Sequence, residues 1–127
     1  MDLSYDLSNK LINGTLSNIP YVPPVKAYLA LYTSDPTKSD TGTEVDQASY
    51  NRQEITMGEP TNGVAKNTAE IEWNGALTSW GLVTHVGIRD AATDGNLMYF
   101  TALDEAKDIG VGDQFKVTPN SLTVTLS

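Results

Sequence analysis

His85 is the only histidine in the chain, so any serine-type catalytic triad would depend on it as the base. No Gly-x-Ser-x-Gly motif marks a nucleophilic serine, and the chain has no cysteine. The strand pattern places His85 on the face opposite Val86 and Ile88, where a local or interface hydrogen bond is its ordinary role. The sequence therefore predicts no catalytic residue.

Metal ligands are also scarce. One histidine without cysteine cannot form the usual tetrahedral zinc site. The carboxylates of Asp35, Asp40, Glu44 and Asp46 lie in one polar stretch and offer the oxygen ligands that calcium prefers. Their spacing is not that of an EF-hand, and the stretch lacks its glycine and terminal glutamate pattern. We expect a solvated acidic loop, with a bound calcium ion as the alternative, and we assign no metal ligand.

A carboxylate pair for glycoside hydrolysis could be drawn from Glu54, Glu70 and Glu72. Glu70 and Glu72 share one strand face, most simply the solvent face, and no cleft is indicated. The glycine-containing run 110–113 lacks the helix and the lysine that a phosphate-binding loop needs. We predict no cofactor and no cofactor-binding residue.

Aromatic side chains could instead line a carbohydrate-binding face. Most occupy inward-pointing strand positions, where core packing or subunit contact is the ordinary use. Trp80 is the exception, because it lies at the start of a strand after a Ser/Thr-rich turn. The other aromatics weighed are Tyr21, Tyr28, Tyr32, Tyr50, Trp73, Tyr99, Phe100 and Phe115.

One helix is predicted, over residues 2–16. Leucines four residues apart from Leu3 to Leu11 form one apolar stripe at the helical period. Asp2 or Ser4 could cap its first turn. A helix of about three turns is marginal alone, so it either covers one end of the sheet or packs on a partner subunit.

The rest of the chain reads as short strands separated by turn signals. The segment 25–32 is too apolar for alternation, which predicts a strand buried on both faces. In the segment 82–90, Leu82, Thr84, Val86 and Ile88 are expected on one face. The dipeptide Asp94-Gly95 predicts a hairpin between 82–90 and 96–103. Further strands are predicted at 50–57, 69–73, 114–118 and 121–126.

These elements predict an all-β fold, an antiparallel β-sandwich or jelly roll with a short N-terminal helix. We divide it into an N-terminal helical segment, residues 1–18, and a β-sandwich domain, residues 19–127. The polar stretch 33–49 is long for a loop in a compact domain, and such loops are usually functional or partly disordered.

The charge balance limits the possible partners. Acidic residues number 16 against 8 basic ones, for a net charge of −8 over 127 residues. Such a charge opposes binding to nucleic acid and to anionic membranes, so neither is expected as a partner. The acidic N-terminus lacks the pattern of a signal peptide. We expect a product made and used in the cytoplasm, or assembled there into something larger.

A set of motifs is spread over nearly the whole chain. The motifs are Ala27-Tyr28-Leu29-Ala30-Leu31-Tyr32-Thr33-Ser34-Asp35-Pro36-Thr37, Gly42-Thr43-Glu44-Val45, Ser49-Tyr50-Asn51-Arg52-Gln53, Ala69-Glu70-Ile71-Glu72-Trp73, Ser79 to Asp90, Gly95 to Leu103, Gly112-Asp113 and Leu122 to Leu126. Together, and in this order, they resemble a family of small tailed-phage virion proteins, and they are specific only as a set.

The resemblance implies a structural virion protein without catalytic residues, assembled in the host cytoplasm. Members are often labelled tail fibre proteins, but tail fibres are usually long repetitive trimers. A one-domain β protein resembles capsid cement or decoration proteins, which implies the major capsid protein and copies of itself, as a homotrimer, as partners. The alternative is a tail-associated or host-receptor module that binds carbohydrate through Trp80.

Two further expectations accompany this interpretation. Glu44 and Arg52 are polar members of the motif set, so a Glu44–Arg52 contact is expected. The N-terminal segment and the 33–49 stretch are expected to contact partners. Removal of residues 1–16 is expected to leave a folded domain.

Overall fold

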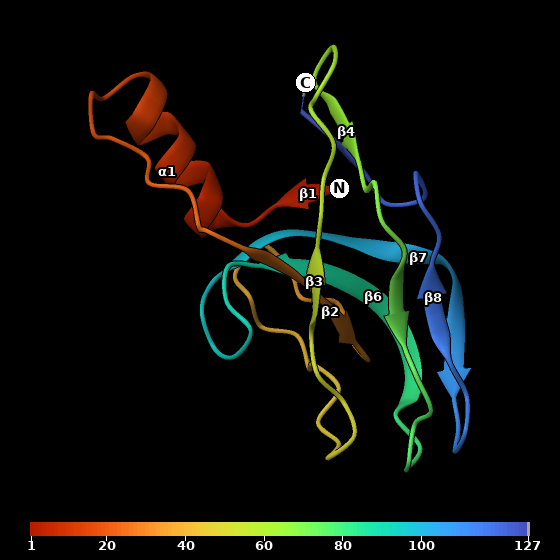
Figure 1. The fold of residues 1–127 in the computed structure, drawn as a ribbon. Helices are drawn as coiled ribbons and strands as arrows, with labels where there is room; N and C mark the ends of the chain where they lie inside the picture. The colour runs from red at the N-terminus through yellow and green to blue at the C-terminus, as the bar shows by residue number, and fades with distance from the viewer. Residues whose placement is uncertain (127) are drawn as a thin grey trace.

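The computed structural model describes residues 1–126, which form one helix and nine strands. All strand pairs are antiparallel, so the chain has the all-β, sandwich-like fold that the sequence predicts, with one short helix (Figure 1). The jelly-roll topology stays a prediction. The bounds are β1 Asp2–Leu3, α1 Tyr5–Thr15, β2 Ala27–Tyr32, β3 Gln53–Ile55, β4 Val64–Lys66, β5 Ile71–Trp73, β6 Gly81–Arg89, β7 Leu97–Ile109, β8 Phe115–Val117 and β9 Thr123–Thr125.

The main layer is a five-stranded sheet in the order β1-β7-β6-β2-β3. Its centre is the predicted hairpin of β6 and β7, which is confirmed. The connecting turn contains Asp94 and Gly95, both with positive φ, the backbone form that tight hairpin turns require. Two smaller pairs, β4–β9 and β5–β8, supply the second layer.

The main core lies between these layers, and a second apolar cluster lies on the far side of the main sheet. In β2, Leu29 and Leu31 face the main core, while Ala30 and Tyr32 belong to the second apolar cluster. Residues 29–32 are all buried, which confirms the predicted strand with two buried faces. A Cβ atom on Gly87 would lie 2.8 Å from the Tyr32 ring, so glycine is needed where the second cluster crosses β6.

A bulge divides the β6–β7 hairpin. The register places residues 103–106 of β7 opposite the single residue Thr84 of β6. The irregularity changes which side chains face the core: Val83 is fully buried, whereas Leu82 is 51% exposed. The expectation that Leu82 shares a face with Val86 and Ile88 is therefore wrong, because simple alternation does not continue through a bulge.

The N-terminal residues divide between the sheet and the helix. Asp2 and Leu3 form β1, which pairs with Phe100 and Tyr99 of β7. Ser4 caps α1 by accepting a hydrogen bond from the Leu7 amide at 3.1 Å. The helix thus begins three residues later than predicted, because the preceding residues pair with a strand. The division of the chain at residue 18 stays a prediction.

The polar stretch 33–49 packs against the sheet. The Thr33 amide donates to the Thr43 carbonyl at 2.9 Å, and the Val45 amide donates to Leu31 at 3.0 Å. Pro36 is among the fully buried residues. The stretch is therefore tied to β2 by backbone hydrogen bonds and contributes buried residues to the fold. No helix within residues 1–126 is long and apolar enough to cross a bilayer.

Candidate functional site

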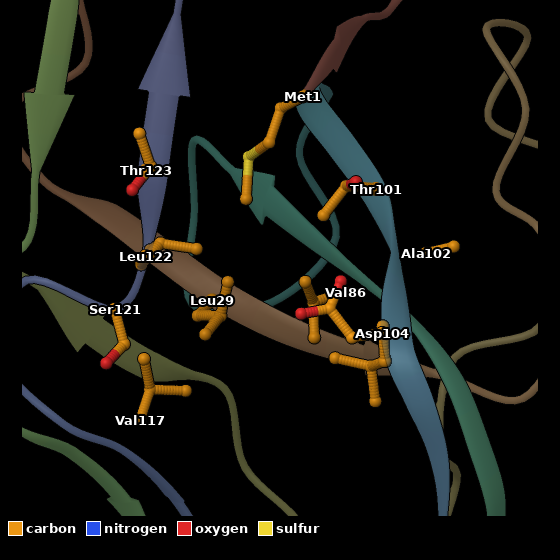
Figure 2. A pocket seen from close by; sticks show the side chains of 11 residues that line it. Met1, Leu29, Val86, Thr101, Ala102, Asp104, Val117, Ser121, Leu122 and Thr123 are labelled. Carbon is orange, nitrogen blue, oxygen red and sulfur yellow. The ribbon is translucent and has the colours of Figure 1, made fainter.

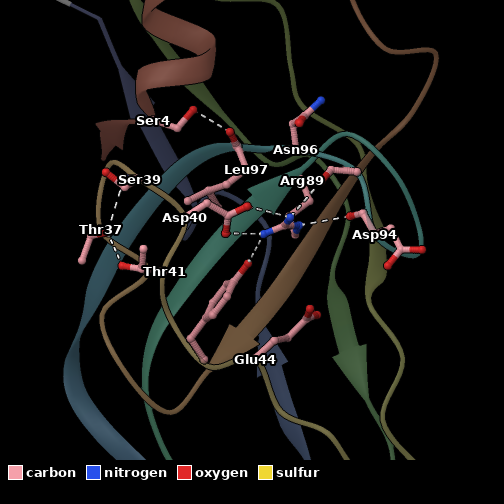
Figure 3. A network of polar contacts seen from close by, with 12 residues as sticks. Ser4, Thr37, Ser39, Asp40, Thr41, Glu44, Arg89, Asp94, Asn96 and Leu97 are labelled. Atoms are coloured by element: carbon pink, nitrogen blue, oxygen red, sulfur yellow. Dashed lines mark hydrogen bonds and ion pairs between the residues drawn. The ribbon is translucent and has the colours of Figure 1, made fainter.

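Arg89 is the centre of a buried polar network at the end of β6 (Figure 3). Its guanidinium donates to both carboxylate oxygens of Asp40, at 2.8 and 2.9 Å. It also donates to the Tyr32 hydroxyl at 3.0 Å and to the carbonyls of Asp94 and Gly95. Such bidentate arginine–carboxylate pairing fixes the relative orientation of the two side chains and also balances their charges. One arginine therefore joins the 33–49 stretch to the β6–β7 turn.

Arg52 makes a parallel set of contacts. It donates to both carboxylate oxygens of Glu44, at 2.9 and 2.8 Å, which confirms the predicted Glu44–Arg52 contact. Another nitrogen of Arg52 donates to the carbonyls of Ala91 and Asp94, each at 2.8 Å. The Tyr50 hydroxyl donates to Glu44 at 2.6 Å. Both arginines thus hold the same hairpin turn, and we call Arg52 and Arg89 the arginine pair.

The arginine pair shifts the titration of its neighbours. Burial alone would raise the pKa of Glu44, but hydrogen bonds from Arg52 and Tyr50 and the arginine charges outweigh it and lower that pKa. Burial and the adjacent Glu44 carboxylate raise the pKa of Tyr50. Burial opposes the charge of Arg89, yet its bonds to Asp40 and Tyr32 raise its pKa. The ionised forms of Glu44 and Arg89 are therefore stabilised at neutral pH.

Three of the four acidic residues predicted as alternative calcium ligands have other partners. Asp40 and Glu44 pair with the arginines, and the Asp35 side chain accepts a hydrogen bond from the Thr37 amide at 2.9 Å. Asp46 is exposed. Within residues 1–126, no group of three or more histidines and carboxylates is arranged to hold a metal ion. Charge balance in this region comes from arginine.

The residues considered for catalysis are dispersed. His85 contacts the neighbouring Thr84 hydroxyl through Nδ1 at 2.7 Å. Glu54 pairs with Lys26 and Glu72 with Lys116, both across exposed strand surfaces, while Glu70 is exposed. No nucleophile and base are brought together from the residues that the sequence singled out.

Trp80 was the candidate for an exposed carbohydrate contact, and its position contradicts that idea. It is 5% exposed, packs edge-on against Tyr50 at a centroid distance of 5.5 Å, and donates from its ring nitrogen to the Ser49 hydroxyl. Trp73 is likewise buried and stacks edge-on with Phe115. The tryptophans therefore belong to the core, where edge-to-face contacts are common.

The exposed apolar surface lies elsewhere. Residues 5–25 comprise α1 and the segment that leads to β2, and we call them the N-terminal arm. In Figure 1, α1 projects from one side of the sheet assembly. The segment returns along the helix, because a Cβ atom on Gly14 would lie 3.1 Å from that of Tyr21. Exposed large apolar residues of the arm are Tyr5, Ile12, Leu16, Ile19, Val22 and Val25.

One family model matches the chain, over residues 2–125, and its description is the podophage GP4 fiber I protein gp80. The chain belongs to this family. The match confirms the resemblance to small tailed-phage virion proteins and makes this a structural protein of a phage virion. No curated protein matches the chain.

In this member of the gp80 fibre family, the Asp40–Arg89 pair and the exposed residues in 19–25 of the arm were not predicted from the sequence, whereas the N-terminal segment was expected to contact partners. Arg89 ends an apolar strand, and an arginine there needs a buried partner; Asp40 was considered only as a calcium ligand. The sequence also carried a signal for the exposed part of the arm. Val22 and Val25 flank two prolines, and no helical or strand period there would place their side chains in the core.

Proposed function

We propose that the chain is a fibre-associated structural subunit that attaches to a podophage virion through its N-terminal arm. The family description supports the association with a fibre. The observation that carries the attachment is the arm's exposed apolar surface, with Leu16 at 82%, Val22 at 83% and Val25 at 99% exposed. We assign the chain no catalytic step.

The arm suits a contact between proteins. Single exposed apolar residues are normal, but a group of six on one short segment is typical of an interaction surface. The arm is also anchored at both ends, since β1 precedes it and β2 follows it in the main sheet. A partner could therefore bind the arm without unfolding the domain.

The partner in this proposal is another virion protein, bound by apolar contact. A protein that binds only the assembled particle stabilises it by its binding free energy. Repeated copies would add multivalent attachment, so weak contacts would suffice. Copies of this chain would meet one another as a homotrimer.

A capsid cement protein is the second candidate. The small size supports it, because residues 1–126 form one sandwich with no long repetitive segment of the kind that builds fibre shafts. In this alternative the arm binds the major capsid protein. Each copy would then bridge neighbouring capsid subunits.

The structure refines how the arm should be tested. Removing residues 1–16 would delete β1, the buried Ser4 and the core residue Leu7, so the expectation of an intact domain is not supported. Substituting exposed residues is cleaner. The triple variant Leu16→Ser, Val22→Ser and Val25→Ser removes only exposed apolar surface from the arm.

The matched control changes three exposed apolar residues outside the arm: Leu77→Ser, Leu82→Ser and Val111→Ser. Each variant would be supplied in place of the wild-type protein during phage growth, and its copies per purified virion measured. We expect the number of copies per virion to fall at least about tenfold for the arm variant, equivalent to about 1.4 kcal/mol of binding free energy. The control variant should be incorporated as often as the wild type. Normal incorporation of the arm variant would reject the proposal. Cryo-electron microscopy of the virion would then place the protein on a fibre or on the shell.

A further inference from the structure

We propose that the open seam of the sandwich binds an extended, basic segment of a partner protein as an added β-strand. The seam is the opening between the β1–β7 side of the main sheet and the turn from β8 to β9. A cavity of about 250 Å³ occupies it (Figure 2). Its lining includes Met1, Thr101, Leu103, Asp104, Leu122 and Thr123. This inference does not depend on the arm or on the proposed function.

The first argument is the incomplete outer edge of β7. Strand β1 pairs with only two residues of β7, Tyr99 and Phe100. Beyond Phe100, β7 continues to Ile109 with β6 on one side and, among the residues that the structure describes, no strand on the other. An unpaired strand edge presents backbone donors and acceptors to which another extended chain can add.

The cavity supplies the second argument. Its inner wall is apolar, formed by Leu29 and Val86 of the main sheet and Leu122 from the second layer. In Figure 2, Thr101 and Thr123 flank the opening from opposite layers. Alternate residues of a strand point to opposite faces, so every second side chain of an added strand could enter the cavity. An apolar side chain there would lie against the cavity wall that Leu29, Val86 and Leu122 form.

Charge identifies the occupant. Asp104 lines the cavity, and Glu105 follows it in the exposed part of the bulge. No lysine or arginine lines the cavity. A second copy of this chain would bring a further net charge of −8, whereas a basic segment would be attracted. The acidic bulge thus selects against self-pairing and for a basic partner.

The test uses two peptides, each alternating three valines with two threonines, with capped ends. One carries a lysine at each end and the other a glutamate. Binding to the ¹⁵N-labelled full chain would be followed by NMR and calorimetry. We expect saturable binding of the lysine peptide, with the largest shifts at Thr101–Asp104 and Leu122–Thr123, and at least about fivefold weaker binding of the glutamate peptide.

Three variants sharpen the assignment. Thr123→Phe fills the opening and should weaken the lysine peptide at least about tenfold. Asp104→Lys leaves the opening unfilled and should reverse the preference between the peptides. Asp46→Lys makes the same charge change on an exposed residue outside the cavity lining, and should alter affinity less than about twofold.

The proposal is overturned by any of four results. These are no saturable binding at millimolar peptide, equal affinity for both peptides, shifts confined to the arm, or self-association that Thr123→Phe abolishes. The Asp104→Lys result stands on its own if Thr123→Phe does not fold. None of these outcomes bears on virion attachment through Leu16, Val22 and Val25.

Discussion

The N-terminal arm and the 33–49 stretch are both long connections into the main sheet, but they expose opposite kinds of side chain. The 33–49 stretch is polar, yet its carboxylates Asp40 and Glu44 are paired with buried arginines. The arm is richer in apolar residues, yet Leu16 and Val25 are almost fully exposed. The polarity of a segment therefore does not show whether its side chains find their contacts within the chain or are left exposed for a partner.

The difference follows from what each segment finds on the sheet. The polar stretch crosses the end of the β6–β7 hairpin, where the arginine pair and several backbone carbonyls converge. Satisfied charge-assisted hydrogen bonds fix a loop that has little apolar surface to bury. The arm finds only one deep apolar position, that of Leu7. Leu11 and Tyr21 pack partly against the core, and the six large apolar residues named above stay exposed.

Breaking the arginine pair should give the largest loss of stability. Arg89→Ala removes a hydrogen bond to the buried Tyr32 hydroxyl and the partner of Asp40, whose side chain is 35% exposed. Removing one partner of a fully buried ion pair costs about 3–5 kcal/mol, and the partial exposure of Asp40 places the expected loss at the lower end of that range. Urea unfolding followed by circular dichroism would measure the free energy of unfolding.

The control for this substitution is Lys26→Ala, which breaks the exposed Lys26–Glu54 pair at 3.4 Å. Exposed pairs contribute about 0–1 kcal/mol. If Arg89→Ala cost no more than Lys26→Ala, the 33–49 stretch would not be held by Arg89.

Within the arm, stability should depend on one helix face. Leu7→Ala removes a side chain that is 2% exposed and leaves a cavity, for an expected loss of about 2–4 kcal/mol. Ile12→Ala on the same helix removes a half-exposed side chain, so a change within about 0.5 kcal/mol is expected. Thermal and urea unfolding of both variants would measure the contrast. Equal losses would mean that Ile12 is buried and that the arm has no exposed apolar face.

Much of the fold could be predicted from local sequence. The apolar run ending at Tyr32 predicted a strand with two buried faces, and the Asp94-Gly95 dipeptide predicted the central hairpin. Both are local signals that tertiary structure did not override. Glu44 and Arg52, only eight residues apart, were also matched correctly, with the motif set as the guide.

The failures concern non-local geometry. Asp40 and Arg89 are 49 residues apart, so only the assembled sheet brings them together. The bulge opposite Thr84 reversed the expected faces of Leu82 and Val83, and no local signal marks it. Trp80 was expected at the surface because it follows a polar turn, but its contacts with Ser49 and Tyr50 come from a distant segment.

The smallest of the three expected effects on stability is a pH dependence, and it tests how the polar stretch 33–49 is held. The pKa of Glu44 is lower in the folded chain than its ordinary value of 4.5. The unfolded chain therefore takes up a proton first as pH falls, and the stabilisation from ionised Glu44 is lost as pH falls through the folded pKa. Above the ordinary value the stabilisation is fully present. Urea midpoints should therefore decline on acidification from pH 6 to pH 3.

Glu44→Gln isolates this contribution, because glutamine keeps the shape of the side chain but not its charge. The variant should be less stable than wild type at pH 7, and the difference should shrink as pH falls below about 4.5. Glu54→Gln makes the same change at an exposed pair and should give only a small difference at every pH. A gap between wild type and Glu44→Gln that did not change with pH would mean that the ionisation of Glu44 is not the source of its contribution. In that case Arg52 and Tyr50 would hold this segment through hydrogen bonds that glutamine does not reproduce, and the contrast with the arm would be one of shape and not of charge.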